Sequence, residues 1–160
     1  MTRQILTRGN VFTAVALIGT ALGLLLVRPT VIVGESMKPA LKTWDFCLML
    51  RQWHYAPRRG DIVMFRTADD PPLWFIKRVI ALPGETVTIQ GGSIRISGRS
   101  VPESYTVPNN FWNMPPTTVP AGKVFVLGDN RTVELEETLH GLVATRLVKG
   151  RLLWSWRWKR

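Results

Sequence analysis

The pattern of hydrophobic positions divides the chain into two parts. Residues 11–27 read VFTAVALIGTALGLLLV, an uncharged and mostly apolar run that ends at Arg28. Seventeen helical residues span roughly 25 Å, close to the ~30 Å hydrocarbon core of a bilayer. The run therefore predicts a transmembrane helix. The chain divides accordingly into a tail at 1–10, an anchor at 11–28 and a domain at 29–160.

A cleavable signal peptide is the alternative interpretation of this run, since it too has a basic start and an apolar centre. The run is longer than the usual apolar core of such a peptide, and no small-x-small site precedes Arg28. An uncleaved anchor is therefore favoured. Arg3 and Arg8, with no acid in the tail, predict a cytoplasmic N-terminus and an extracytoplasmic domain.

Beyond the anchor, short apolar, β-branched or aromatic runs alternate with turn residues, a pattern typical of strands. They predict strands at 30–33, 45–50, 61–66, 74–81, 86–90, 93–97 and 123–128. Gly91-Gly92 separates two alternating runs, which predicts a hairpin with a two-residue turn. The expected fold is an all-β domain that follows one N-terminal transmembrane helix.

Three segments differ from this pattern. Residues 102–120, rich in proline, predict a long surface loop, and residues 132–143 could form one helical turn. In residues 152–160, Trp alternates with polar or basic residues. This tail indicates either a terminal strand with one buried Trp face or an interfacial anchor on anionic lipid.

Composition limits the partners. The 21 Lys+Arg against 11 Asp+Glu give a net charge of +10, which implies an anionic lipid surface or nucleic acid. Lipid is favoured, because no nucleic-acid-binding motif is found. Cys47 is the single cysteine, which excludes an intrachain disulfide framework and predicts a small buried side chain. His54 and His140 lack the spacing of metal ligands, so no metal is expected.

Ser36 is a candidate nucleophile, because it lies between an apolar β-branched run and a Met-x-Pro bend. It follows Arg28 by eight residues, so it can lie at most ~30 Å from the membrane exit. A serine turn that bonds its own backbone is the alternative interpretation. A serine hydroxyl attacks a carbonyl only when a base takes its proton.

Three bases are available to Ser36. A triad with His140 and Asp129 has no local support, and the adjacent Glu35 would point to the opposite face of an extended chain. Lys77 has apolar strand neighbours, and burial lowers the pKa of a lysine towards that of a usable base. Ser–Lys dyads are a known variant of triad chemistry. A snorkelling surface lysine is the alternative.

These stretches resemble the signal peptidase I family of membrane-anchored Ser–Lys peptidases. Four boxes occur in the family's order, at 34–41, 59–63, 76–85 and 119–131. The resemblance covers about the whole chain. It implies an all-β, membrane-associated fold that removes signal peptides from exported preproteins after a small-x-small motif, without a metal or cofactor.

The resemblance also assigns roles to residues. Ser36 would be the nucleophile, Lys77 the general base, and the Ser36 N–H one oxyanion donor. Gly34 occupies a position where many members carry a hydroxyl that supports the oxyanion. The remaining matches are Arg78 and Asp129 as a supporting ion pair, with Ile32, Met37 and Ile76 at the pocket for a small substrate side chain.

The chain departs from the family after Arg131. Glu134 replaces the serine that normally orients the lysine amine, and Thr138 replaces an arginine. A carboxylate beside Lys77 would raise the lysine pKa, the wrong direction for a base. Either the segment shifts so that Thr132 or Thr138 supplies the hydroxyl, or the pH optimum changes, or activity is impaired.

The sequence therefore predicts a serine endopeptidase with two partners, signal peptides of preproteins and the lipid bilayer, and no nucleic acid. The expected location is the plasma membrane, with an organelle inner membrane as the alternative. Other functions left open are a specialised processing peptidase of the same superfamily and a catalytically impaired, membrane-anchored binding protein. A basic membrane-surface or nucleic-acid-binding module would explain the charge but not the four boxes.

Overall fold

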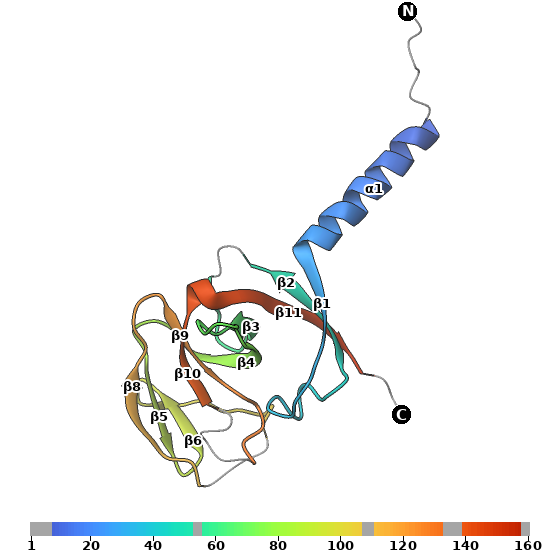
Figure 1. The fold of residues 1–160 in the computed structure, drawn as a ribbon. Coiled ribbons are helices and arrows are strands. Elements are labelled where there is room, and N and C mark those ends of the chain that lie inside the picture. The colour runs from blue at the N-terminus through green and yellow to red at the C-terminus, as the bar shows by residue number, and fades with distance from the viewer. Residues whose placement is uncertain (1–7, 53–55, 107–110, 133–138, 158–160) are drawn as a thin grey trace, which may run out of the picture.

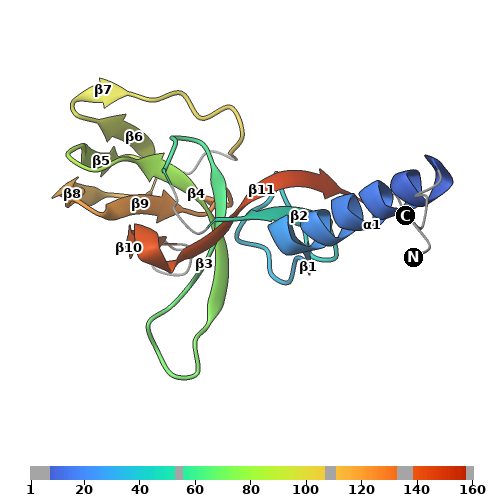
Figure 2. The same cartoon turned by 90° about the horizontal axis from the view of Figure 1, so that it is seen from above.

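The computed structural model describes residues 8–52, 56–106, 111–132 and 139–157, which form one helix and two antiparallel sheets (Figures 1 and 2). The larger sheet has seven strands in the order β1-β2-β11-β3-β4-β9-β10. Its strands are β1 (Val27–Val31), β2 (Phe46–Arg51), β3 (Ile62–Arg66), β4 (Trp74–Ala81), β9 (Lys123–Leu127), β10 (Leu139–Ala144) and β11 (Val148–Trp156). A 3-10 turn, η1 (Thr145–Leu147), joins the last two.

The smaller sheet has four strands in the order β7-β6-β5-β8. They are β5 (Thr86–Gln90), β6 (Ser93–Ile96), β7 (Arg99–Ser100) and β8 (Met114–Thr118). The predicted hairpin is confirmed, since β5 and β6 pair in register around Gly91-Gly92. Both glycines have positive φ (52° and 74°), the conformation that a tight two-residue hairpin turn requires.

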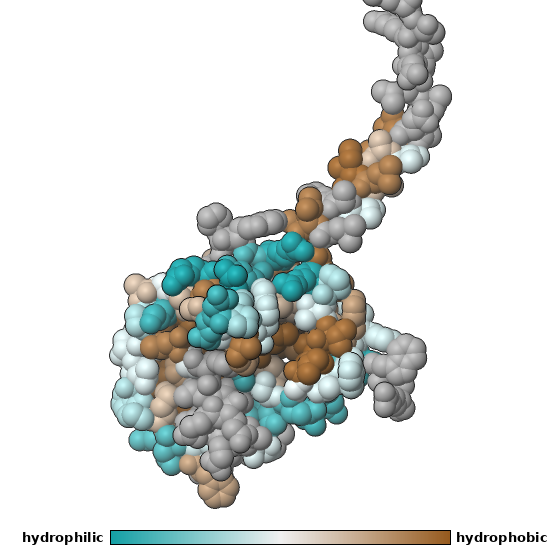
Figure 3. Space-filling model, viewed as in Figure 1, coloured by the Kyte–Doolittle hydropathy of each residue, from teal (hydrophilic) through white to brown (hydrophobic). Residues whose placement is uncertain are grey.

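The helix α1 (Arg8–Leu26) extends away from the sheets and meets them only near β1 and β2 (Figure 1). Hydrophobic side chains along it are exposed (Figure 3), among them Phe12, Leu17 and Ile18. In the part of the chain that is described, no helix has the combined length and hydrophobicity needed to cross a membrane.

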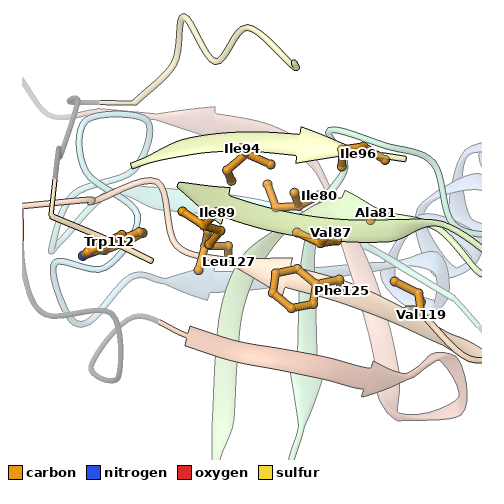
Figure 4. Close-up of a cluster of buried hydrophobic side chains, with 10 residues drawn as sticks. All are labelled: Ile80, Ala81, Val87, Ile89, Ile94, Ile96, Trp112, Val119, Phe125 and Leu127. Atoms are coloured by element: carbon orange, nitrogen blue, oxygen red, sulfur yellow. The ribbon is translucent and has the colours of Figure 1, made fainter. Parts of the chain in front are cut away.

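The largest apolar cluster lies between the two sheets (Figure 4). Inward-facing residues of β5 and β6 pack there against Phe125 and Leu127 of β9 and against Trp112. Alternation along β6 explains the packing, because Ile94 and Ile96 are buried whereas Ser93 and Arg95 are exposed. A separate cluster, which includes Ile32, Met37 and Met64, fills the space beneath the segment that carries Ser36.

The predicted β domain is confirmed, and the seven predicted strands agree with β1–β6 and β9 to within a few residues at each end. Cys47 is buried as expected. The prediction of a loop throughout 102–120 is wrong at β8. This strand contains Pro115 and Pro116, and among the described strands it pairs with β5 alone. Proline is tolerated on such an edge strand because one side of the backbone needs no hydrogen bonds.

The C-terminal third also differs from expectation. Within the segment 132–143, the described residues from Leu139 onward form strand β10 rather than a helical turn. Residues 152–156 of the tail are part of β11, which lies between β2 and β3. Trp154 and Trp156 are 50% and 45% exposed, so these two side chains do not form a buried face. The interfacial interpretation of the tail is therefore the one that remains to be tested.

The core predicts a clear contrast between neighbours on β6. Replacing Ile94 with Ala should lower the free energy of unfolding by about 2–5 kcal/mol, since it removes buried methyl groups and leaves a cavity. Replacing the exposed Arg95 with Ala should change it by no more than about 0.5 kcal/mol. Chemical denaturation of the full chain in detergent measures both, and equal losses would contradict the assignment of the β6 faces.

Candidate active site

The segment 34–41, here called the serine turn, lies in the connection between β1 and β2. Gly34 has φ +110°, a conformation that residues with a Cβ rarely adopt. Its N–H donates to Thr43 Oγ1 (3.1 Å), and the Thr43 hydroxyl donates back to the Gly34 carbonyl (3.0 Å). This pair of bonds closes the connection, and Ser36 lies half-buried at its bend.

Ser36 lines a cleft of about 250 Å³. The three residues that the sequence assigned to the substrate pocket, Ile32, Met37 and Ile76, all line the same cleft. Ile32 and Met37 are buried, so the hydroxyl lies beside a fixed apolar surface. Trp74 and Met64 also contribute to the wall.

Lys77 lies in the middle of β4, opposite Val63 of β3. Its side chain is only 2% exposed, as its apolar neighbours predict, so it does not snorkel to the surface. Burial lowers the pKa of Lys77 from 10.5 to about 8, and the negative charge of Asp129 offsets part of this effect. A considerable fraction of these amines is therefore neutral, and able to accept a proton, near physiological pH.

The structure brings the elements of the two residues together without a direct bond. Ile76, the residue before Lys77, lines the cleft that contains Ser36. Among the hydrogen bonds of the described residues, none joins the Ser36 and Lys77 side chains. A proton transfer between them would require the two side chains to approach each other, and catalytic hydrogen bonds in unliganded enzymes are often long or absent.

Arg78 and Asp129 form the ion pair that the resemblance implied. Arg78 Nε donates to Asp129 Oδ1 (2.8 Å) and Nη2 to Oδ2 (2.6 Å), while Nη1 donates to the Gly60 carbonyl (2.9 Å). Asp129 is fully buried. A two-pronged pair of this kind fixes the position of both partners, so it ties β4 to the segment that follows β9.

A second buried pair, which the sequence pattern did not predict, lies beside the first. Glu103 accepts two bonds from Arg131, at 2.9 and 2.6 Å. Tyr105 donates to Glu103 (2.9 Å), and its ring lies 4.0 Å from the Arg78 guanidinium. Glu103 and Tyr105 belong to a proline-rich segment without strand periodicity, and for that reason pattern analysis assigned them no role.

Asn130 connects directly to the serine turn, a contact that the sequence also did not reveal. Its backbone N–H donates to the Ser36 carbonyl (3.0 Å), and its side-chain Nδ2 donates to the Glu35 carbonyl (3.1 Å). Asp129 and Asn130 are adjacent. One dipeptide therefore holds the lysine strand through its first residue and the serine turn through its second.

The other candidate bases are engaged elsewhere. The Glu35 carboxylate pairs with Lys38 and lies 2.9 Å from the Thr43 hydroxyl, whose single proton it shares with the Gly34 carbonyl. Both oxygens of Asp129 accept from Arg78. Glu134, Thr138 and the side chain of His140 lie outside the described residues. The Thr132 hydroxyl donates to Asn130 Oδ1 (2.6 Å), so it is committed to Asn130.

Within the described residues, His, Cys, Asp and Glu side chains form no group of three or more that could hold a metal. Cys47 is isolated in the apolar cluster, where burial raises the pKa of its thiol to about 11. At neutral pH this thiol is protonated and a poor nucleophile.

A comparison with known proteins agrees with this geometry. The profile of the family described as "Signal peptidase, peptidase S26" matches residues 5–158. The chain belongs to this family. The signal peptidase I of Leptolyngbya laminosa is 39% identical over 131 residues, which cover 75% of this chain and 64% of that protein. The probable signal peptidase I-1 of Synechocystis is 34% identical over 134 residues, covering 78% and 68%.

The matched region therefore spans about two thirds of the length of these S26 relatives. Among solved structures, a signal peptidase I from Enterococcus faecalis is similar, with a TM-score of 0.49 and 29% identity. That similarity covers 61% of this chain and 97% of that chain.

The buried lysine predicts a pH-dependent stability penalty. Between pH 8 and 10.5 the unfolded chain binds a proton at Lys77 that the folded chain has released, so the stability of the wild type rises with pH in this window. Lys77→Met removes the penalty. At pH 7 it should raise the free energy of unfolding by about 3 kcal/mol, and the gain should shrink as the pH approaches 10.

Denaturant titrations of wild type and Lys77→Met at pH 7 and pH 10 measure this difference. Lys42→Met, which replaces an exposed lysine, is the matched control and should show the same stability relative to wild type at both pH values. A Lys77→Met difference that does not vary with pH would contradict a depressed lysine pKa.

Proposed function

We propose that this S26 protein is a serine endopeptidase that removes signal peptides from exported preproteins, with Ser36 as nucleophile and Lys77 as general base. The observation that carries the proposal is the burial of Lys77 on β4, the strand whose residues Trp74, Phe75 and Ile76 line the cleft that contains Ser36. A buried lysine without a carboxylate bound to its amine costs stability, and activation of a nucleophile is a reason to retain one. Similarity to signal peptidases I supports the substrate class.

The reaction follows from these two groups. Neutral Lys77 takes the proton of Ser36 Oγ as that oxygen attacks the scissile carbonyl carbon. The tetrahedral intermediate collapses, the carbon–nitrogen bond breaks, and the Lys77 ammonium gives its proton to the leaving amine. Water then attacks the Ser36 ester while neutral Lys77 takes one of its protons. The bond from the acyl carbon to Ser36 Oγ breaks, the Lys77 ammonium returns the proton to Oγ, and the second product leaves as a carboxylic acid that ionises in water.

The negative charge on the intermediate needs a donor. No acceptor among the described residues takes the Ser36 N–H, which leaves it available to the oxyanion. Gly34 contributes no side-chain donor, and the hydroxyl of Thr43 is bonded to Gly34 and Glu35. A single backbone donor supports slower acylation than two, by about 10²–10³-fold in other serine proteases.

The cleft supports a preference for small side chains. Its volume of about 250 Å³ must accommodate backbone as well as side chain, and its surface at Ile32, Met37 and Ile76 is apolar. Ile32 and Met37 pack in the cluster below the turn and cannot withdraw without opening the core. Alanine-sized residues match such a shallow surface.

Cleavage of a preprotein with an Ala-x-Ala site, in detergent, tests the proposal. Ser36→Ala and Lys77→Ala should each lower kcat/KM by about 10³-fold or more. Wild-type kcat/KM should rise with pH and reach half its maximum near pH 8, because Lys77 acts in its neutral form. A midpoint displaced towards pH 10 would indicate that the Glu134 carboxylate raises the pKa of Lys77.

Ser93→Ala and Lys42→Ala change exposed residues of the same types and should retain wild-type activity. If the folded wild type cleaves nothing between pH 6 and 10, the proposed peptidase activity fails. If Lys77→Ala retains activity while Ser36→Ala does not, another group is the base.

The proposal extends to the membrane surface, with a cytoplasmic N-terminus and the β domain outside. Exposed apolar residues along α1 support it, as does the uncharged run 11–27. The outer face of three adjacent strands supports it as well. Register aligns Val31 of β1, Phe46 of β2 and Trp156 of β11, with Trp154 beside them, and all four are exposed. Trp favours the depth of lipid headgroups.

Quenching of Trp fluorescence by brominated lipids in proteoliposomes tests this contact. The quenched fraction should fall in the double variant Trp154→Ser, Trp156→Ser and should not fall in Trp112→Phe, which removes a buried Trp. Point substitutions are preferable to deletion of 152–160, which would remove half of an interior strand. Equal quenching in the double variant and the wild type would exclude lipid contact at β11.

A further inference from the structure

We propose that Asn130 is the positioning residue that fixes the serine turn relative to the lysine strand, and that Thr132 holds the Asn130 amide in the orientation this requires. The inference rests on the proposed roles of Ser36 and Lys77. It concerns how the serine turn and the lysine strand keep the spacing that proton transfer needs, through a residue 95 positions from Glu35 in the sequence.

The contacts are specific to the nucleophile. Asn130 is buried, and it donates two hydrogen bonds to consecutive carbonyls of the serine turn, those of Glu35 and Ser36. Two bonds to adjacent peptide units fix the orientation of the chain as well as its distance. They therefore set the direction of the Ser36 Cα–Cβ bond, and with it the region that Oγ can reach.

The orientation of the Asn130 amide is determined by its partners. Oδ1 accepts from the Thr132 N–H (3.1 Å) and from the Thr132 hydroxyl (2.6 Å), whereas Nδ2 faces a carbonyl oxygen. A flipped amide would put NH₂ against an N–H donor and an oxygen against an oxygen. Only the observed orientation satisfies these contacts, and Thr132 enforces it.

The hydrogen bonds of Asn130 with Glu35, Ser36 and Thr132 are here called the clamp. Asp129, the residue before Asn130, connects the clamp to the strand that carries Lys77. Asp129 is bonded to Arg78, which follows Lys77 on β4. The path from nucleophile to base therefore runs through two adjacent residues and a set of short bonds. Since a misplacement of about 1 Å can cost about 10²-fold in rate, loosening one end of this path should slow acylation. Asn130 does not line the substrate cleft.

Asn130→Asp is the sharpest test, because it is isosteric and keeps an acceptor for Thr132. It replaces the donor Nδ2 with an oxygen that repels the Glu35 carbonyl. We expect kcat to fall about tenfold or more while KM changes no more than about twofold. Thr132→Val should lower kcat by a smaller factor, and Thr132→Ser, which keeps the hydroxyl, should restore the wild-type value.

Asn113→Asp is a control with the same pattern of hydrogen bonds at an exposed position. Asn113 also accepts from a backbone N–H, that of Gly91, and donates through Nδ2 to the Phe111 carbonyl, but it lies by the 86–97 hairpin. The Asn113→Asp variant should have the kcat of the wild type. If the loss of any amide donor slowed catalysis, both variants would be slow, whereas a positioning role slows Asn130→Asp alone.

Hydrogen–deuterium exchange of the full chain in detergent gives a readout independent of catalysis. Asn130→Asp and Thr132→Val should speed exchange in the peptide 34–41 by about threefold or more and leave the hairpin 86–97 unchanged. Thr132→Ser should match the wild type. Because Thr132 is exposed, its variants test the clamp even if Asn130→Asp folds poorly.

The outcomes separate this inference from the proposed function. If the wild type cleaves preproteins and Asn130→Asp alters neither kcat nor exchange, the clamp is refuted and the peptidase assignment stands. If exchange increases as expected but the wild type cleaves nothing, the clamp stands as a structural feature and its role in positioning a nucleophile is refuted. A fall in kcat with a matching rise in KM would identify a substrate-binding residue instead.

Discussion

Burial of the Lys77 amine is the constraint on which the rest of the site depends. A lysine in the middle of a strand, between apolar neighbours, loses the hydration that favours its charged form. A negative charge bonded to the amine would restore that form and remove the base. The surrounding structure must therefore supply the polar contacts that hold the strand in place without offering Lys77 a close carboxylate.

The two buried ion pairs meet this requirement. Asp129 lies near enough to raise the pKa of Lys77, but both of its oxygens are directed to Arg78, and this limits its effect. Glu103 is likewise directed to Arg131, with Tyr105 between the pairs. Each buried charge in this group has its own partner, a condition that buried charges must meet. The lysine is left as the buried cation with no bonded carboxylate among the residues described.

Much of this arrangement was predictable from sequence, and the failures have physical causes. Strands with regular alternation, such as 86–90 and 93–97, were found because one face of each contacts the core. The edge strand β8 was missed because it contains two prolines. Strands β10 and β11 were missed because the residues between them, 145–147, include no Gly, Pro, Asn or Asp to mark a turn. Ser36 and Lys77 could be named because each lies in a distinctive local context. Glu103, Tyr105 and Asn130 act through contacts between distant segments, which no local pattern encodes.

The order of strands in the larger sheet has a consequence for when the enzyme can become active. The serine turn connects β1 and β2, Lys77 lies on β4, and β11 stands between the two groups as the only described strand that pairs with both β2 and β3. Of the described strands, β11 is also the last to be synthesised. During biogenesis the strands next to Ser36 and Lys77 are therefore not joined into one sheet until β11 has emerged. A chain made only as far as β10 would carry both residues without the strand that joins their parts of the sheet, so synthesis of β11 would be the step that completes the site.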